Sequence, residues 1–143
     1  MGDVSVQSGG TAGEAAAAEP REDVARSELQ ELAAAMVRFY KDAFGRGPTR
    51  ARAYYVGSDT VIVLLEHSLT VAESNLAVLG EHQRLRDARV FFHYAVEGEM
   101  RSLVERVLGR RTVAFVSGID TRQDLAAEIF TLAPEPDRGG RPR

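Results

Sequence analysis

The sequence predicts an α+β domain in which a helix, a hairpin, further helices and a second hairpin follow one another along the chain. Apolar residues recur at three- and four-residue spacing in residues 29–43 and again in residues 85–107, which is typical of amphipathic helices. Two pairs of short, β-branched segments flank the second of these helical stretches. We therefore expect a four-stranded, mostly antiparallel sheet packed by two long helices.

The first helix has a clear apolar stripe and a clear end. Gly45 stands where a left-handed C-terminal cap is favoured, and Pro48 cannot extend the helix. The stripe consists of Leu29, Leu32, Met36, Tyr40 and Ala43.

Two strands follow, at residues 50–56 and 60–66, joined by the polar turn 57–59. Alternation in the first strand places Arg50, Arg52 and Tyr54 on one face. The second strand is apolar on both faces, and the short turn predicts an antiparallel hairpin.

The middle of the chain is predicted to be helical. Thr70 and Glu73 form a capping-box pattern for a short helix that ends near Leu79, and Gly80 breaks it. One long helix then ends at Gly109, and strands are expected at residues 111–117 and 126–132. The stripe of the long helix is Leu85, Ala88, Phe92, Val96, Met100, Leu103 and Val107.

Composition divides the chain into three parts. Residues 1–21 are rich in Gly, Ala, Ser and acidic residues and are expected to form a disordered leader. Residues 134–143 hold three prolines with a basic bias and are expected to form a disordered tail. The predicted folded unit is a single domain over residues 22–133.

Two strands of the predicted sheet, 60–66 and 111–117, are apolar on both faces. If helices cover only one face, a partner subunit must bury the other. We therefore expect a homodimer, although helices on both faces would satisfy the same pattern in a monomer.

Composition also excludes several classes of function. A net charge of −3 argues against a nucleic-acid partner, which would need a basic surface. No apolar run approaches the roughly 20 residues that span a bilayer. The chain has no Cys, which removes thiol chemistry and favours a reducing, cytoplasmic location.

A further signal comes from four segments: Gly45–Ala51, Leu69–Glu73, Gly109–Ser117, and Asp124–Ala126 with Glu128–Leu132. Together they resemble a family of small bacterial proteins named for the MpsC component of a sodium-translocating, membrane-potential-generating system. The resemblance implies a cytoplasmic soluble protein linked to a membrane system for cation energetics, and hence a membrane-protein partner. It implies no agreed catalytic residues, so none is carried over.

The corner between the first helix and the first strand carries the most concentrated chemistry. Arg46, Arg50 and Arg52 can converge on a carboxylate, phosphate or bicarbonate-like anion, and Gly47 leaves backbone amides unobstructed. The alternative is a helix cap and turn whose arginines pair with acidic side chains or cover the sheet edge.

Carboxylates gather before the fourth strand. Asp120, Asp124 and Glu128 can act as acid, base or cation ligands. The alternative is that Asp120 has a turn role and that Glu128 pairs across the sheet with an arginine such as Arg52. The three histidines lack metal-ligand spacing and are expected to be structural or exposed, so no metal, cofactor or catalytic residue is predicted.

The sequence thus predicts a soluble accessory or ligand-binding module. The alternative is an enzyme or a regulatory sensor that acts on a small anion at the corner from Arg46 to Arg52.

Overall fold

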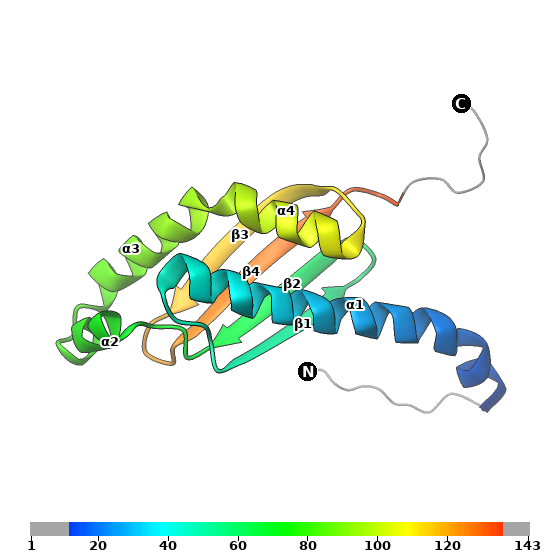
Figure 1. Cartoon of the computed structure of the whole chain (residues 1–143), viewed down its shortest axis with the longest axis horizontal. Coiled ribbons are helices and arrows are strands. Elements are labelled where there is room, and N and C mark those ends of the chain that lie inside the picture. Colours follow the sequence, from blue (N-terminus) through cyan, green and yellow to red (C-terminus); the bar gives the residue numbers. More distant parts are fainter. Residues whose placement is uncertain (1–11, 136–143) are drawn as a thin grey trace.

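The α+β fold class is confirmed by a computed structural model, which describes residues 12–135, with side chains from Arg21 onward (Figure 1). Four helices and four strands make up this part of the chain. In chain order they are α1 (Ala12–Phe44), β1 (Arg50–Val56), β2 (Thr60–Glu66), α2 (Val71–Val78), α3 (His82–Ala95), α4 (Glu97–Leu108), β3 (Thr112–Asp120) and β4 (Leu125–Leu132).

The sheet has the order β1-β2-β4-β3 and every neighbouring pair is antiparallel. Each of the two hairpins is a sequential pair, and the helices α2, α3 and α4 connect one hairpin to the other. β2 and β4 occupy the centre, and apart from Glu128 the inner residues of both strands are mostly apolar on both faces, as is typical of central strands.

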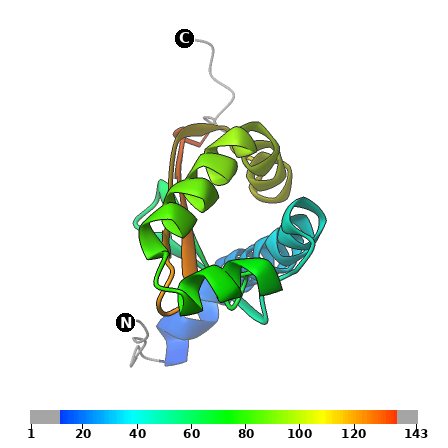
Figure 2. The ribbon, with the colours of Figure 1, turned by 90° about the vertical axis from the view of Figure 1, so that its left-hand side faces the viewer.

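The helices cover one face of the sheet. Figure 1 shows α1, α3 and α4 in front of the strands, and Figure 2 shows α1 and α4 on the same side of them. Burial alternates strictly along β2 and β4, since only one face of each meets the helices. The core beneath the helices is mostly aliphatic, and its fully buried members include Leu32, Met36, Val61, Val63, Leu65, Met100 and Val104.

The predicted single long helix over residues 85–107 is wrong, because α3 ends at Ala95 and α4 begins at Glu97. Val96 has φ −105° and ψ 18°, outside the helical region, and interrupts the run. The branched Val96 and the nearby Gly98 both have low helix propensity, so this is the weakest point of the stretch.

The predicted ends of the helices are largely confirmed. Gly45 and Gly109 have φ of 81° and 69°, the left-handed conformation expected of C-terminal caps. Thr70 and Glu73 form both hydrogen bonds of the capping box, and Gly80 follows α2 with φ 81°.

The two strands of the second hairpin extend closer to its turn than predicted. β3 runs to Asp120 and β4 starts at Leu125, so only residues 121–124 form the polar connection, which was expected from Gly118. The predicted leader of residues 1–21 overlaps α1 from Ala12 onward, and its first 11 residues lie outside the described part. Residues 136–143 of the predicted tail also lie outside it. The domain limits stay a prediction.

Candidate functional site

A group of polar side chains lies inside the apolar core, between the sheet and the helices α1 and α3. We call Tyr40, His93, Ser117 and Glu128 the Glu128 cluster. The hydroxyls of Tyr40 and Ser117 each donate to the Glu128 carboxyl, at 2.5 Å to Oε2 and 2.5 Å to Oε1 respectively. His93 Nδ1 lies 2.6 Å from Ser117 Oγ and 3.1 Å from Glu128 Oε2. Tyr40, His93 and Glu128 are all fully buried.

Each member of the cluster comes from a different element. Ser117 in β3 and Glu128 in β4 are direct cross-strand partners, so their side chains stand next to each other on the helix-covered face. Tyr40 belongs to the buried stripe of α1, and His93 to that of α3. A single carboxyl therefore joins both strands of the second hairpin to both helices above them.

A buried arginine lies one helical turn before His93. Arg89 is only 1% exposed, and its Nη2 donates to Ser68 Oγ at 2.7 Å and to the Ser68 carbonyl at 3.3 Å. Its Nε lies 3.5 Å from Glu73 Oε2, and its guanidinium carbon lies 4.0 Å from the centre of the Phe44 ring. Arg89 thus connects the start of α2 to the end of α1.

Burial shifts the pKa values of the cluster in opposite directions. It raises the pKa of Glu128 from 4.5 to about 7, although the hydrogen bonds from Ser117 and Tyr40 and the charge of Arg89 oppose this. Burial and the charge of Arg89 lower the pKa of His93 from 6.5 to about 3. At neutral pH the 3.1 Å contact between His93 and Glu128 therefore joins a neutral imidazole to the carboxyl, and it is not an ion pair.

The hydrogen bonds indicate which tautomer His93 adopts when Glu128 is ionised. Because Ser117 donates its only hydroxyl proton to Glu128, its oxygen accepts from His93 Nδ1–H. His93 Nε2 is then an unprotonated acceptor. It is buried and has no hydrogen-bond partner among the described residues, and the same holds for Arg89 Nη1.

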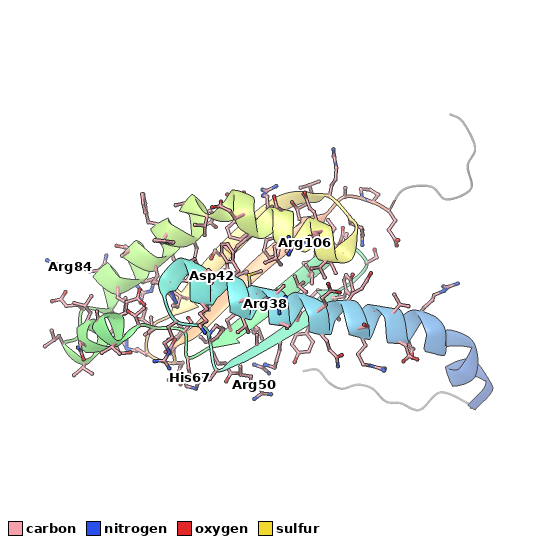
Figure 3. The ribbon with its side chains drawn as sticks, in the orientation of Figure 1. Arg38, Asp42, Arg50, His67, Arg84 and Arg106 are labelled. Atoms are coloured by element: carbon pink, nitrogen blue, oxygen red, sulfur yellow. The ribbon has the colours of Figure 1, made fainter. Side chains whose placement is uncertain are left out.

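The predicted anion site is occupied in part by a carboxylate of the chain itself. Arg52 Nη2 lies 3.0 Å from Glu66 Oε2, and Arg50 Nε lies 3.8 Å from the same oxygen. Gly47 packs against α1, since a Cβ there would meet the Val37 carbonyl at 3.2 Å. Figure 3 shows Arg50 at the periphery of the molecule. These contacts favour the structural alternative for Arg50 and Arg52, and an anion site with Arg46 stays a prediction.

The three predicted carboxylates do not form one site. Asp120 accepts hydrogen bonds from the backbone N–H groups of Arg122 and Gln123, as the turn alternative expects. Asp124 accepts from the N–H groups of Ser68 and Leu69 and so holds the loop before α2. Glu128 alone reaches the core.

The expected pairing of Glu128 with Arg52 is wrong. Val63 is the β2 neighbour of Glu128, whereas Leu64 is the β2 neighbour of Arg52. The two side chains therefore stand on opposite faces of the sheet.

Sequence reasoning missed Arg89 and His93 because it assigned the inward face of α3 to apolar residues. Ala88 and Phe92 are in fact exposed, while Leu85, Arg89 and His93 at four-residue spacing are buried. Their four-residue spacing from the apolar Leu85 was the only feature of the sequence that could have indicated that Arg89 and His93 are buried. Tyr40 was assigned to the core correctly, without its role as a donor.

Other features of the described residues carry less chemistry. A surface hollow next to Ser58, Leu132 and Pro134 also contains Arg110, whose guanidinium already donates to the carbonyls of Ser58 and Ala133. Within residues 12–135, His, Asp and Glu side chains form no group of three or more suited to a metal ion. In the same part of the chain, no helix has the length and hydropathy needed to cross a membrane.

Comparison with protein families identifies one family that matches most of the chain. The family described as "Na+-translocating membrane potential-generating system (MpsC)" matches residues 26–134. The chain belongs to the MpsC family. The matched segment of this MpsC-family chain contains the whole Glu128 cluster together with Arg89, and it confirms the resemblance seen in the sequence. Searches of curated proteins and of solved structures find no match.

Proposed function

We propose that this MpsC-family chain is a soluble, cytoplasmic accessory module of a sodium-translocating, membrane-potential-generating system, and that it responds to pH through protonation of Glu128. The link to ion translocation rests on the family description. The pH response rests on one observation: a fully buried carboxyl is shared by two strands and two helices, and burial brings its pKa to about 7. We propose no catalytic reaction.

Protonation changes the hydrogen bonds that Glu128 can make. The ionised carboxyl only accepts, and it satisfies the hydroxyls of Tyr40 and Ser117 at once. The protonated carboxyl must donate to one of these oxygens, so that hydroxyl must turn its proton elsewhere. Tyr40 transmits the change to α1, and Ser117 transmits it to His93 in α3. A charge change of this kind acts on the packing of both helices against the sheet.

The charge of Arg89 influences the protonation of Glu128. The positive charge of its guanidinium favours the ionised form of Glu128. When Glu128 binds a proton, Glu73 is the carboxylate that remains near Arg89, at 3.5 Å from its Nε. Protonation therefore also alters the electrostatic balance at the start of α2.

The proposal is tested first on the isolated chain. Carbon-13 NMR of side-chain carboxyls should give a titration midpoint for one glutamate near 7, and this signal should be missing in Glu128→Gln. A midpoint for Glu128 near the ordinary value of 4.5 would show that the carboxyl is hydrated and that the proposed sensor is wrong.

The role in a membrane system needs a second experiment. The chain is used as bait for detergent-solubilised membranes of its source cell at about pH 6 and about pH 8. We expect recovery of a multi-spanning cation-translocating protein, in an amount that differs between the two pH values for wild type and not for Glu128→Gln. Recovery with the same pH dependence for both baits would contradict the sensing role, and no such membrane protein at either pH would contradict the accessory role.

The alternative function, an enzyme or regulatory sensor for a small anion at the corner from Arg46 to Arg52, has less support. Glu66 already neutralises part of the charge of Arg50 and Arg52, and it would have to move aside for an anion to bind between them.

A further inference from the structure

The face of the sheet opposite the helices has one fully apolar row in its middle, and its charged side chains, Arg50, Arg52, Glu66 and Asp120, lie toward one end. The helices lie on the other side of the strands (Figure 1, Figure 2). Tyr54 is 44% exposed and Val116 is 54% exposed on this face. The register places both in one row across the four strands, in the order Tyr54, Ile62, Ile129, Val116. We call this face, made of one side of β1 to β4, the open face.

Charges at the end of the open face are arranged asymmetrically. The last row reads Arg50, Glu66, Leu125, Asp120 from β1 to β3. The Arg50 side chain is 63% exposed, and Asp120 is also exposed. In this row, the edge strand β1 thus carries a positive side chain and the edge strand β3 a negative one. The opposite end row, with Val56, Thr60, Thr131 and Ala114, carries no charge.

We propose that the open face binds a second copy of this chain, related by a two-fold axis that runs parallel to the strands between β2 and β4. This inference goes beyond the proposed function and does not depend on it. Such an axis places β1 of one copy over β3 of the other, and the central row packs on itself. It brings Arg50 of each copy to Asp120 of the other, twice per dimer.

The charges select this axis over the other symmetric choice. A two-fold axis perpendicular to the strands would place the end row with Arg50 and Asp120 on the row with Val56 and Ala114. Asp120 would then lie on an apolar side chain, which is unfavourable, and Arg50 would keep only Glu66 of its own chain. Both axes leave the strands of the two copies aligned, as in paired sheets whose strands differ by roughly 30° in direction, so the charges alone distinguish the two axes.

The size of the face predicts the strength of the dimer. Strands of seven residues, spaced about 4.8 Å apart and rising about 3.3 Å per residue, give a face of roughly 450 Å² per copy. This is small beside the roughly 800 Å² per partner of a standard stable interface. The dimer should therefore dissociate on dilution, and its affinity must be measured over a concentration series.

Charge reversal gives a sharp test. In Arg50→Asp alone, both cross pairs become acidic, and in Asp120→Arg alone, both become basic. In an equal mixture of the two variants, both cross pairs of the mixed dimer are attractive again. We measure dissociation constants by sedimentation velocity at constant ionic strength, with circular dichroism to verify folding. Arg84→Asp, an equal charge change at a helix residue with 86% side-chain exposure, is the matched control.

We expect each single variant to dissociate on the order of tenfold more readily than wild type. The mixture should recover wild-type affinity to within a few-fold, and Arg84→Asp should be unchanged. A mixture no tighter than its components would overturn the parallel axis. A wild-type chain that stays a monomer at the highest concentration would overturn the open face as a self-interaction surface.

A second pair of variants tests the apolar row and does not depend on charge pairing. Val116→Lys places an ammonium in the middle of the interface, whereas Val78→Lys makes the same change at an 86% exposed residue of α2. We expect only the first to abolish dimerisation. Equal dimerisation of both variants would show that the open face is not the contact.

Discussion

Replacement of Glu128 by glutamine should change how the stability of the chain depends on pH. The pKa rise from 4.5 to about 7 means that the ionised carboxyl is on the order of 3 kcal/mol less favourable in the folded core than in the unfolded chain. Between these two pH values the unfolded chain loses its proton before the folded chain does. Glu128 therefore lowers the free energy of unfolding as pH rises from about 4.5 to about 7, and the loss is complete above about 7.

His93 has the opposite effect over a partly overlapping range. Its pKa falls from 6.5 in the unfolded chain to about 3 in the folded one, so its contribution to stability increases as pH rises from about 3 to 6.5. In wild type the two slopes oppose each other between about 4.5 and 6.5. Glu128→Gln removes only the negative slope, so the variant should gain stability relative to wild type as pH rises.

The assay is urea unfolding followed by circular dichroism, for both proteins, from about pH 5 to about pH 8.5. The stability of the variant minus that of wild type should increase by roughly 2 to 3 kcal/mol across this range, or about 10 °C in melting temperature. The changed hydrogen bonds of the amide add an offset that does not vary with pH, so only the slope is interpreted.

Glu105→Gln is the matched control. Hydrogen bonds from Thr112 lower the pKa of Glu105, so this carboxyl stays ionised throughout the range and its variant should differ from wild type by a constant. If the stability difference between Glu128→Gln and wild type is the same at about pH 5 and about pH 8.5, the pKa of Glu128 is not raised in the folded chain, and the proposed pH response is refuted.

Three further predictions concern single contacts. Arg89→Ala should destabilise the fold by about 2 to 4 kcal/mol, because it removes a fully buried side chain together with its hydrogen bond to Ser68 and its contact with Phe44. Arg89→Lys should recover only part of this, since an ammonium cannot both stack on Phe44 and reach Ser68, and equal stability of all three chains by chemical unfolding would contradict the prediction. Thr70→Ala should cost about 1 kcal/mol by removing the capping box, with an unchanged melting curve as the contrary result. Glu66→Gln should strengthen thermal stabilisation by phosphate at constant ionic strength, because it frees Arg52; no shift in wild type or variant would leave the corner purely structural.

The sequence predicted most of the architecture because local signals and long-range packing agree there. β1 and β2 have the predicted bounds, since alternation and a polar turn at residues 57–59 specify both the strands and their pairing. Gly45 and the capping box at Thr70 end or begin helices through backbone chemistry that needs no tertiary partner. Strand order could not be predicted, because either hairpin can add to the sheet through either of its strands.

The candidate site was mostly not predictable, and the reason lies in α3. Its outward face carries Phe91, Phe92 and Tyr94, which are 76%, 41% and 41% exposed, while its inward face carries Arg89 and His93. Pattern analysis assumes that apolar side chains face the core. That assumption fails where polar groups satisfy one another inside, and the satisfying partners, Ser68 and Glu128, come from segments far away in the chain.

The break at Val96 has a consequence for how parts of the molecule open. α4 is anchored by Met100, Leu103, Val104 and Leu108, whose burial does not depend on pH, whereas two of the three buried side chains of α3 are Arg89 and His93. If α3 and α4 formed one continuous helix, the buried side chains of both segments would have to leave the core together. With the break, α3 can detach as a separate cooperative unit while α4 stays packed on α1 and β3. The protonation state of one carboxyl would then set how often this unit opens, while the rest of the domain stays closed.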